Sequence, residues 1–235
     1  MDCPRLSERL LKTASLVPPC GTFLDVGTDH AYLPVYLIKK GICKKAIASD
    51  VKKGPLDSAK KTAQAFDVLN LIDLRLGSGF ETVAKGEADC AVVAGMGGKL
   101  ISELLAASKD TARSIKRLIL QPMTAVYELR KFLYENNYTI DSEILAKEDF
   151  KLYHILSVSP KPSPPLKDTE LFMGTHLLSE ENEYFAEYTA RQINKLKKQI
   201  DGLKKSKSAQ KQKILPEKEK FLEDIEKLLE RKKPK

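Results

Sequence analysis

Cysteine is scarce in this chain of 235 residues, and its four copies stand apart at Cys3, Cys20, Cys43 and Cys90. No CxxC pair and no Cys/His cluster occurs in the sequence, which argues against a structural zinc site and a disulfide framework. Long apolar runs are also missing, and the N-terminal stretch lacks the continuous apolar region of a signal peptide. These absences predict a cytoplasmic protein with no membrane span and no bound metal.

The dinucleotide-binding fingerprint GxGxxG is missing as well. In the stretch TFLDVGTDHAYLP, residues 22–34, a short apolar strand runs into Gly27 and a helix follows. Asp29 and Tyr32 stand where the fingerprint requires glycines, and a carboxylate at Asp29 would repel a pyrophosphate. The pattern therefore argues against an NAD-dependent oxidoreductase. S-adenosylmethionine (SAM) fits better, because its sulfonium and ammonium favour nearby carboxylates such as Asp25 and Asp29. The alternative is an ordinary turn, with Gly27 at positive φ and the carboxylates capping a helix.

Apolar strands alternate with amphipathic helices up to residue 136, and two adjacent strands follow. This order predicts an α/β fold with a mostly parallel seven-stranded sheet and one antiparallel strand, the outline of the Rossmann-like class I SAM-dependent methyltransferases. The first helix is expected either across the sheet edge or beside the cofactor cleft. The strands are predicted over residues 22–26, 46–49, 71–76, 90–94, 117–120, 139–147 and 151–159. The helices are predicted over residues 5–17, 31–40, 100–107 and 126–136, and residues 60–66 are predicted to complete the second crossover helix.

Further candidate residues follow the later strands. Asp50 ends the second strand, where related folds bind ribose hydroxyls, although an aspartate there also serves as a helix N-cap. The turn around Ser78 either approaches an adenine ring or is an ordinary turn. Gly95 and Met96 open a glycine-rich segment after the fourth strand, which allows close backbone approach to a ligand.

The periodicity changes beyond the proline-rich segment 160–165, which predicts a methyltransferase domain over residues 1–160 and a helical domain over residues 161–235. Apolar residues repeat at heptad spacing from Ile193 to Leu203, and a second helix is predicted over Pro216–Arg231. A polar turn at Lys205–Gln210 separates the two helices. Together they predict an antiparallel coiled-coil hairpin.

Positive charge concentrates in this tail. Residues 195–235 hold 15 Lys and Arg against 7 Asp and Glu, a net charge of +8 that equals the formal net charge of the whole chain. A neutral body with a basic tail is expected when the tail binds a polyanion, although a solvated lysine-rich coiled coil gives the same count. The RNA-contacting residues are predicted to be Lys195, Lys197, Lys198, Lys204, Lys205 and Lys207.

Five motifs, specific in combination, resemble the bacterial tRNA (adenine-22-N1) methyltransferase family, TrmK. They are LSERL at 6–10, DVGTDHAYLP at 25–34, SDVKKGPL at 49–56, AGMGG at 94–98 and LQPM at 120–123. The resemblance implies a SAM-dependent enzyme that methylates N1 of adenine 22 in the D-loop region of tRNA. A non-catalytic SAM- and RNA-binding protein and a methyltransferase of another RNA or small molecule remain as alternatives. A monomer is favoured.

The resemblance also implies roles for the motif residues. Similar enzymes often carry Gly-Asp-Gly where this chain has Gly77-Ser78-Gly79, so the adenine contact at Ser78 is weaker, because a hydroxyl replaces a carboxylate. Gly95 and Met96 would lie by the sulfonium and the incoming base. The remaining cofactor residues are Asp25, Gly27 and Asp29 at the methionine end and Asp50 at the ribose.

The chemistry can be argued from the acceptor atom itself. N1 of adenine has a lone pair that attacks a sulfonium methyl directly, so alignment matters more than a strong base. The target edge is used in base pairing, so the base must first be exposed, and His30 and Tyr32 are predicted to stack on it. Asp29 is predicted to accept a hydrogen bond from the N6 amino group of the adenine. Arg9 is predicted to pair with a cleft carboxylate or a phosphate. The alternatives are a capping or packing His30, a core Tyr32 and a surface Arg9.

Overall fold

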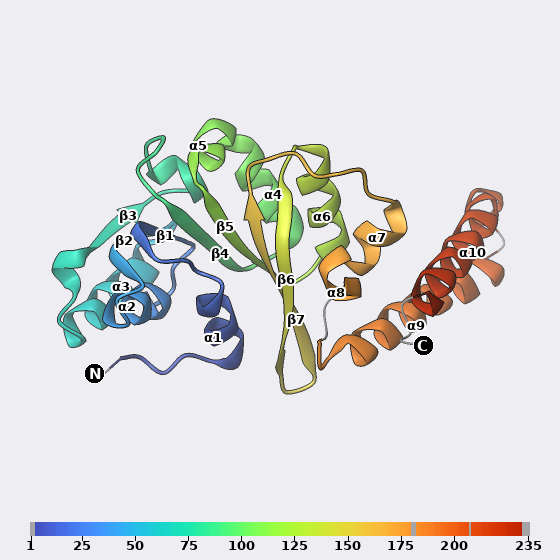
Figure 1. Ribbon diagram of the computed structural model, residues 1–235, viewed down its shortest axis with the longest axis horizontal. Coiled ribbons are helices and arrows are strands. Elements are labelled where there is room, and N and C mark those ends of the chain that lie inside the picture. The colour runs from blue at the N-terminus through green and yellow to red at the C-terminus, as the bar shows by residue number, and fades with distance from the viewer. Residues whose placement is uncertain (1–2, 180–181, 207, 232–235) are drawn as a thin grey trace. The chain divides into compact units, whose positions relative to one another are not determined.

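The computed structural model describes residues 3–179, 182–206 and 208–231. The chain divides into two compact units, Met1–Ser163 and Pro164–Lys235. The first unit holds a seven-stranded sheet covered by helices, and the second unit is helical (Figure 1). The predicted α/β fold class with a mostly parallel seven-stranded sheet is confirmed.

The sheet has the strand order β3-β2-β1-β4-β5-β7-β6. Only β7 runs antiparallel to its neighbours, β5 and β6, so the predicted terminal hairpin is correct. The order reverses between β1 and β4, and in such sheets a ligand binds at the carboxyl ends of the strands beside the reversal. The strands are β1 (Cys20–Val26), β2 (Cys43–Asp50), β3 (Ile72–Leu76), β4 (Cys90–Met96), β5 (Arg117–Pro122), β6 (Thr139–Glu148) and β7 (Lys151–Ser159).

Helices cover both faces of the sheet because its buried strands are apolar on both sides. In β1, Phe23 packs in one core cluster, and its neighbours Leu24 and Val26 pack in the other. One face carries α1 (Glu8–Ser15), α2 (Tyr32–Lys39) and α3 (Lys53–Ala65). The other carries α4 (Gly98–Ala107), α5 (Lys109–Ser114) and α6 (Val126–Glu135). Two 3₁₀ turns, η1 (Leu69–Leu71) and η2 (Gly79–Thr82), flank β3.

The helical unit contains α7 (Asp168–Met173), α8 (Thr175–Ser179), α9 (Phe185–Lys204) and α10 (Ala209–Glu230). Ion pairs Lys197–Glu226 and Lys204–Glu219, at 3.1 and 2.8 Å, show that α9 and α10 run antiparallel. The coiled coil itself stays a prediction.

The predicted start of the last helix at Pro216 is wrong, because α10 begins at Ala209 and contains this proline. A proline inside a helix removes one backbone hydrogen bond and crowds the preceding turn. Contacts of α10 with α9 and α7 offset that cost. The connection between the long helices is therefore shorter than the predicted polar turn at Lys205–Gln210.

Candidate cofactor and acceptor site

Three turns meet at the carboxyl edge of the sheet, beside the reversal between β1 and β4. The amides of Gly27 and Thr28, which follow β1, both donate to the Ser49 carbonyl of β2 at 2.8 Å. The Gly77 amide, which follows β3, donates to the Asp50 carbonyl at 3.0 Å. These bonds hold the three turns together, so the predicted cofactor residues of these turns lie along one edge. These residues are Asp25, Gly27, Asp50 and Ser78.

Gly27 is the tightest point of this edge. Its φ is +77°, a conformation that residues with a side chain rarely adopt. A Cβ there would lie 2.2 Å from the Cε atom of Met96, so the Met96 side chain reaches across from β4 over the glycine turn. The turn after β1 therefore needs glycine both for its backbone and for the close approach of Met96.

Asp25 is a buried carboxylate near the end of β1, with 8% of its surface exposed. Burial raises its pKa from 3.8 to about 6, a hydrogen bond with Thr28 lowers it in part, and the nearby charge of Asp50 raises it further. Within the described residues, no lysine or arginine forms an ion pair with Asp25. A cationic ligand at this edge would supply the missing counter-charge, which fits the ammonium and sulfonium of SAM.

Asp50 ends β2 half-buried, and its Oδ1 accepts a hydrogen bond from the Lys52 amide at 2.8 Å. It is not the N-cap of α3, because that position belongs to Lys52. Two large apolar side chains beside it were missed in the sequence. Val51 is 62% exposed, and Leu76, the register partner of Asp50 in β3, is 65% exposed. Apolar residues at the polar ends of adjacent strands were the available signal, and their exposed side chains are available to contact a ligand ring.

The loop before α2 and the start of that helix carry the predicted acceptor-side residues Asp29, His30 and Tyr32. The N-cap of α2 is Ala31, and no side chain forms a capping hydrogen bond with this helix, so the predicted alternative of a capping histidine is wrong. The Ala31 amide donates to the Thr28 hydroxyl at 3.1 Å. The rings of His30 and Tyr32 stack with centroids 5.2 Å apart and planes 13° apart, and His30 Nε2 lies 3.4 Å from Asp29 Oδ2. Tyr32 is 42% exposed, which excludes the alternative of core packing. An aromatic pair beside a carboxylate is the kind of surface that can receive a flat base.

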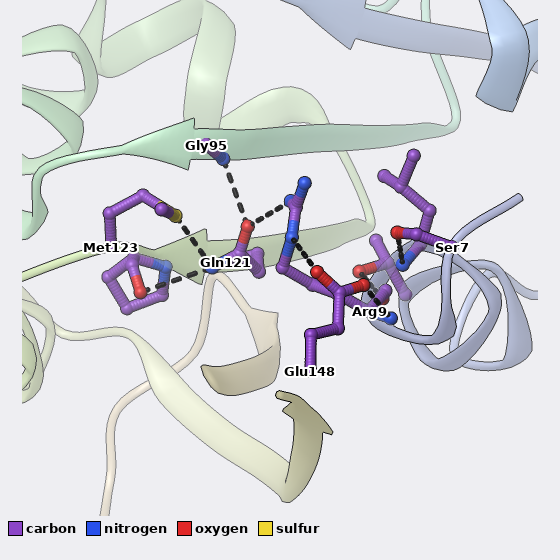
Figure 2. A network of polar contacts seen from close by, with 9 residues as sticks. Ser7, Arg9, Gly95, Gln121, Met123 and Glu148 are labelled. Carbon is purple, nitrogen blue, oxygen red and sulfur yellow. Dashed lines mark hydrogen bonds and ion pairs between the residues drawn. The ribbon is translucent and has the colours of Figure 1, made fainter. Parts of the chain in front are cut away.

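Arg9 extends from α1 toward the ends of β4 and β5 (Figure 2). Its Nη1 donates to Gln121 Oε1 at 2.6 Å, its amide donates to Glu148 Oε1 at 2.8 Å, and its guanidinium lies over the Tyr153 ring. The alternative of a surface arginine is wrong, because only 20% of the side chain is exposed. The carboxylate that it meets belongs to β6 and not to a cofactor turn. Of the two predicted locations for α1, the one across the sheet edge is confirmed, because α1 packs on the edge strand β6 and on its neighbour β7. The location beside the cofactor cleft stays a prediction.

Comparisons with known proteins identify the family. The family model described as TrmK, tRNA (adenine(22)-N(1))-methyltransferase, matches residues 23–228. The chain belongs to this family. It is 34% identical over 194 residues to the tRNA (adenine(22)-N(1))-methyltransferase of Bacillus subtilis, covering 80% of this chain and 82% of that protein.

Solved structures agree with the sequence match. The crystal structure of the B. subtilis m1A22 tRNA methyltransferase TrmK has a TM-score of 0.87 and 30% identity, covering 96% of this chain and 99% of that one. A Streptococcus pneumoniae protein solved in complex with SAM has a TM-score of 0.79 and 31% identity, covering 96% of this chain and all of that one. The predicted resemblance to the TrmK family is confirmed.

The predicted RNA-contacting lysines of this TrmK chain fall into two groups. Lys197 and Lys204 pair with glutamates of α10, whereas Lys195, Lys198 and Lys205 form no ion pair among the described residues. Lys207 lies outside the described residues. The six lysines therefore do not form one equivalent set.

Two further findings concern the sequence-based absences. Among residues 3–179, 182–206 and 208–231, no group of three or more His, Cys, Asp or Glu side chains is arranged to hold a metal ion. No helix in the described part of the chain is long and apolar enough to cross a membrane.

Proposed function

We propose that this TrmK-family chain transfers the methyl group of SAM to N1 of adenine 22 in tRNA. The observation that carries the proposal is the buried carboxylate of Asp25, without a cationic partner among the described residues, at the reversal point of the sheet. It lies at the same edge as the glycine turn at Gly27 and the Asp50 carboxylate. This arrangement suits a cofactor with cationic groups at one end and a ribose further along.

SAM supplies an electrophilic methyl group on its sulfonium. In our proposal Asp25 and Asp29 attract the charged methionine end, and the backbone of Gly27 leaves room for it. Asp50 accepts hydrogen bonds from the ribose hydroxyls, as acidic residues at this position do in related folds. Ser78 contacts the adenine ring. The last two cofactor residues, Gly95 and Met96, lie on the acceptor side.

The acceptor adenine must leave its stacked position before its N1 can react. The exposed base stacks on the paired rings of His30 and Tyr32, and the Asp29 carboxylate accepts a hydrogen bond from its N6 amino group. No strong base is required, because N1 attacks with its own lone pair and catalysis consists mainly of alignment. The cytoplasmic location and the monomeric state stay predictions.

The test is transfer of a labelled methyl group from SAM to two tRNA transcripts that differ only at position 22. We expect label in the transcript with adenine 22 and none in its twin with guanine 22. No label in either transcript, with SAM still bound by calorimetry, would favour a non-catalytic SAM- and RNA-binding protein. Equal label in both would move the target to another adenine.

Lys195 and Lys198, which form no ion pair among the described residues, indicate that one face of α9 binds the phosphates of the tRNA. Lys195 and Lys198 share a face with Arg191, since residues three and four apart are neighbours on a helix. The buried Leu196 and Ile200 lie on the opposite side. A shallow hollow on the outer face is lined by Arg191, Asn194, Lys195, Lys198 and Gln199. Such a surface binds phosphates without reading sequence.

A pair of double variants tests this face. The variant Lys195→Gln/Lys198→Gln should weaken tRNA binding about tenfold in moderate salt and lower the salt-dependence slope by about 1.5, because two phosphate contacts are lost. The matched control Lys197→Gln/Lys204→Gln removes the same charge from lysines already paired with glutamates. It should change the slope by less than half as much. Equal slopes for both variants, measured by filter binding over a salt series, would contradict the assignment.

A further inference from the structure

Gln121 is a fully buried polar side chain at the end of β5, and every hydrogen-bonding role of its amide is used (Figure 2). Its Oε1 accepts from Arg9 Nη1 at 2.6 Å and from the Gly95 amide at 3.1 Å. Its Nε2 donates to the Pro122 carbonyl at 3.2 Å and lies 3.7 Å from Met123 Sδ. These contacts fix which way the amide points, because the donor and acceptor ends cannot be exchanged.

The Gly95 amide needs this acceptor because the sheet does not provide one. The register of β4 with β5 shifts between Ala94 and Met96, so Gly95 is a bulge residue outside the regular pairing. Its φ of +79° is a second sign of the bulge. Although Gly95 is exposed, its amide is held by a side chain that is fully buried. Gln121 therefore sets the conformation of the bulge from inside the protein.

The bulge leads directly to the cofactor turn. Met96 follows Gly95, its carbonyl accepts a hydrogen bond from the Met123 amide at 2.8 Å, and its side chain reaches to Gly27. A rotation of the bulge would therefore shift Met96 against the turn after β1. In the sequence Gln121 is visible only as part of the motif LQPM. Its contact with Arg9 could not be predicted, because the two residues are 112 positions apart.

Arg9 is held at its other end by the β6–β7 hairpin. Burial alone would raise the pKa of Glu148, but hydrogen bonds from Ser7 and the Arg9 amide, together with the Arg9 charge, hold this pKa below its usual range. An ionised Glu148 thus keeps the start of α1 in place, and α1 delivers the guanidinium to Gln121.

We propose that Gln121 is a positioning residue for methyl transfer, holding the Gly95 bulge and the Arg9 guanidinium on one oxygen atom. This inference rests on the proposed function. Gln121 acts through the backbone that carries Met96, while the cofactor turns after β1 and β2 keep their own hydrogen bonds. Its loss should therefore reduce the rate of transfer and leave binding of the cofactor nearly unchanged.

The first variant is Gln121→Met, which fills the same volume and removes the hydrogen bonds. We expect kcat with tRNA to fall about 10- to 100-fold, because small misplacements of a reacting group cost that much. KM for tRNA and Kd for S-adenosylhomocysteine should change less than threefold. Gln64→Met, on the exposed face of α3, is the control and should match the wild type. A kcat of Gln121→Met within threefold of the wild type would overturn the proposal.

Amide hydrogen exchange of Gly95, followed by NMR in the cofactor-free protein, gives a readout besides activity. Exchange should speed up in Gln121→Met and stay slow in Gln121→Glu, which keeps the oxygen that faces Arg9 and the Gly95 amide but loses the donor to the Pro122 carbonyl. The kcat of Gln121→Glu should therefore fall less than that of Gln121→Met. A loss of kcat in Gln121→Glu as large as in Gln121→Met, with Gly95 still protected, would overturn the role. If the wild type methylates no tRNA while Gly95 responds as expected, the proposed function fails and the hydrogen-bond clamp stands.

Discussion

Replacing Asp25 with asparagine is expected to weaken SAM binding about 100-fold at pH 7, which calorimetry would measure. The wild-type affinity should also fall about tenfold between pH 7 and pH 5. The reason is that the pKa of Asp25 is about 6, so a proton competes with the cationic ligand below that pH. The variant should lack this dependence, because asparagine does not titrate.

The same substitution should stabilise the cofactor-free protein. Because the folded-state pKa of Asp25 is raised above its ordinary value of 3.8, this group favours folding fully below pH 3.8 and loses that effect as the pH rises through about 6. Asparagine removes the buried charge, so the free energy of unfolding at pH 7 should rise by about 2 kcal/mol. Stability gained at the cost of binding is typical of a functional site.

Two controls make the experiment specific. Adenosine has no methionine end, so its binding should be independent of pH and of the substitution. Asp110→Asn, on the exposed surface of α5, should leave SAM affinity and stability unchanged. An Asp25→Asn protein that binds SAM as tightly as the wild type would rule out Asp25 as a partner of the methionine end.

Replacing Glu143 with alanine is expected to cost about 3 to 5 kcal/mol of unfolding free energy, measured by urea denaturation. Arg130 of α6 and Glu143 of β6 are each 1% exposed and joined by two hydrogen bonds, at 3.0 and 2.6 Å. His154 Nδ1 of β7 lies 2.7 Å from the same carboxylate. Removing the carboxylate leaves a buried guanidinium without this counter-charge, which is far more costly than losing a surface ion pair.

The pH dependence of this cluster has the opposite sign to that of Asp25. Burial alone would raise the pKa of Glu143, but Arg130 and His154 lower it from 4.5 to about 2. Its contribution is therefore complete above pH 4.5 and is lost as the pH falls toward 2. Glu135→Ala, at an exposed position of α6, is the matched control and should change stability by less than about 0.5 kcal/mol. An equal effect of both substitutions would contradict a structural role for the buried cluster.

The sheet and its cofactor edge could be predicted because local sequence determines them. The central strands β1, β4 and β5 are short and mostly apolar, and parallel strands bring their carboxyl ends to the same edge. Asp25, Gly27 and Asp50 follow this rule, since Asp25 is the last residue but one of β1, Gly27 follows β1 and Asp50 ends β2. Strand ends were less certain, because β4 continues through Gly95 to Met96 as a bulge that no local pattern reveals.

The short helices and the start of α10 could not be predicted from the sequence, because tertiary contacts determine them. The helices α5, α7 and α8 have six, six and five residues, too few for a helical repeat to be recognised. Pro216 reads locally as the start of a helix, and contacts with α7 and α9 allow the helix to continue through it. In each case packing outweighs local preference.

The buried polar contacts of the first unit were the feature that the sequence predicted least. Gln121 and Arg9 are 112 positions apart, and Arg130 meets Glu143 and His154 only after α6, β6 and β7 have packed together. Periodicity identifies apolar faces, since burial of apolar surface follows a repeat. It does not identify a buried polar side chain, because that residue is stabilised by one partner at one distance. The sequence thus determined the sheet, the turns and the charge of the tail, whereas the tertiary structure decided which polar groups meet.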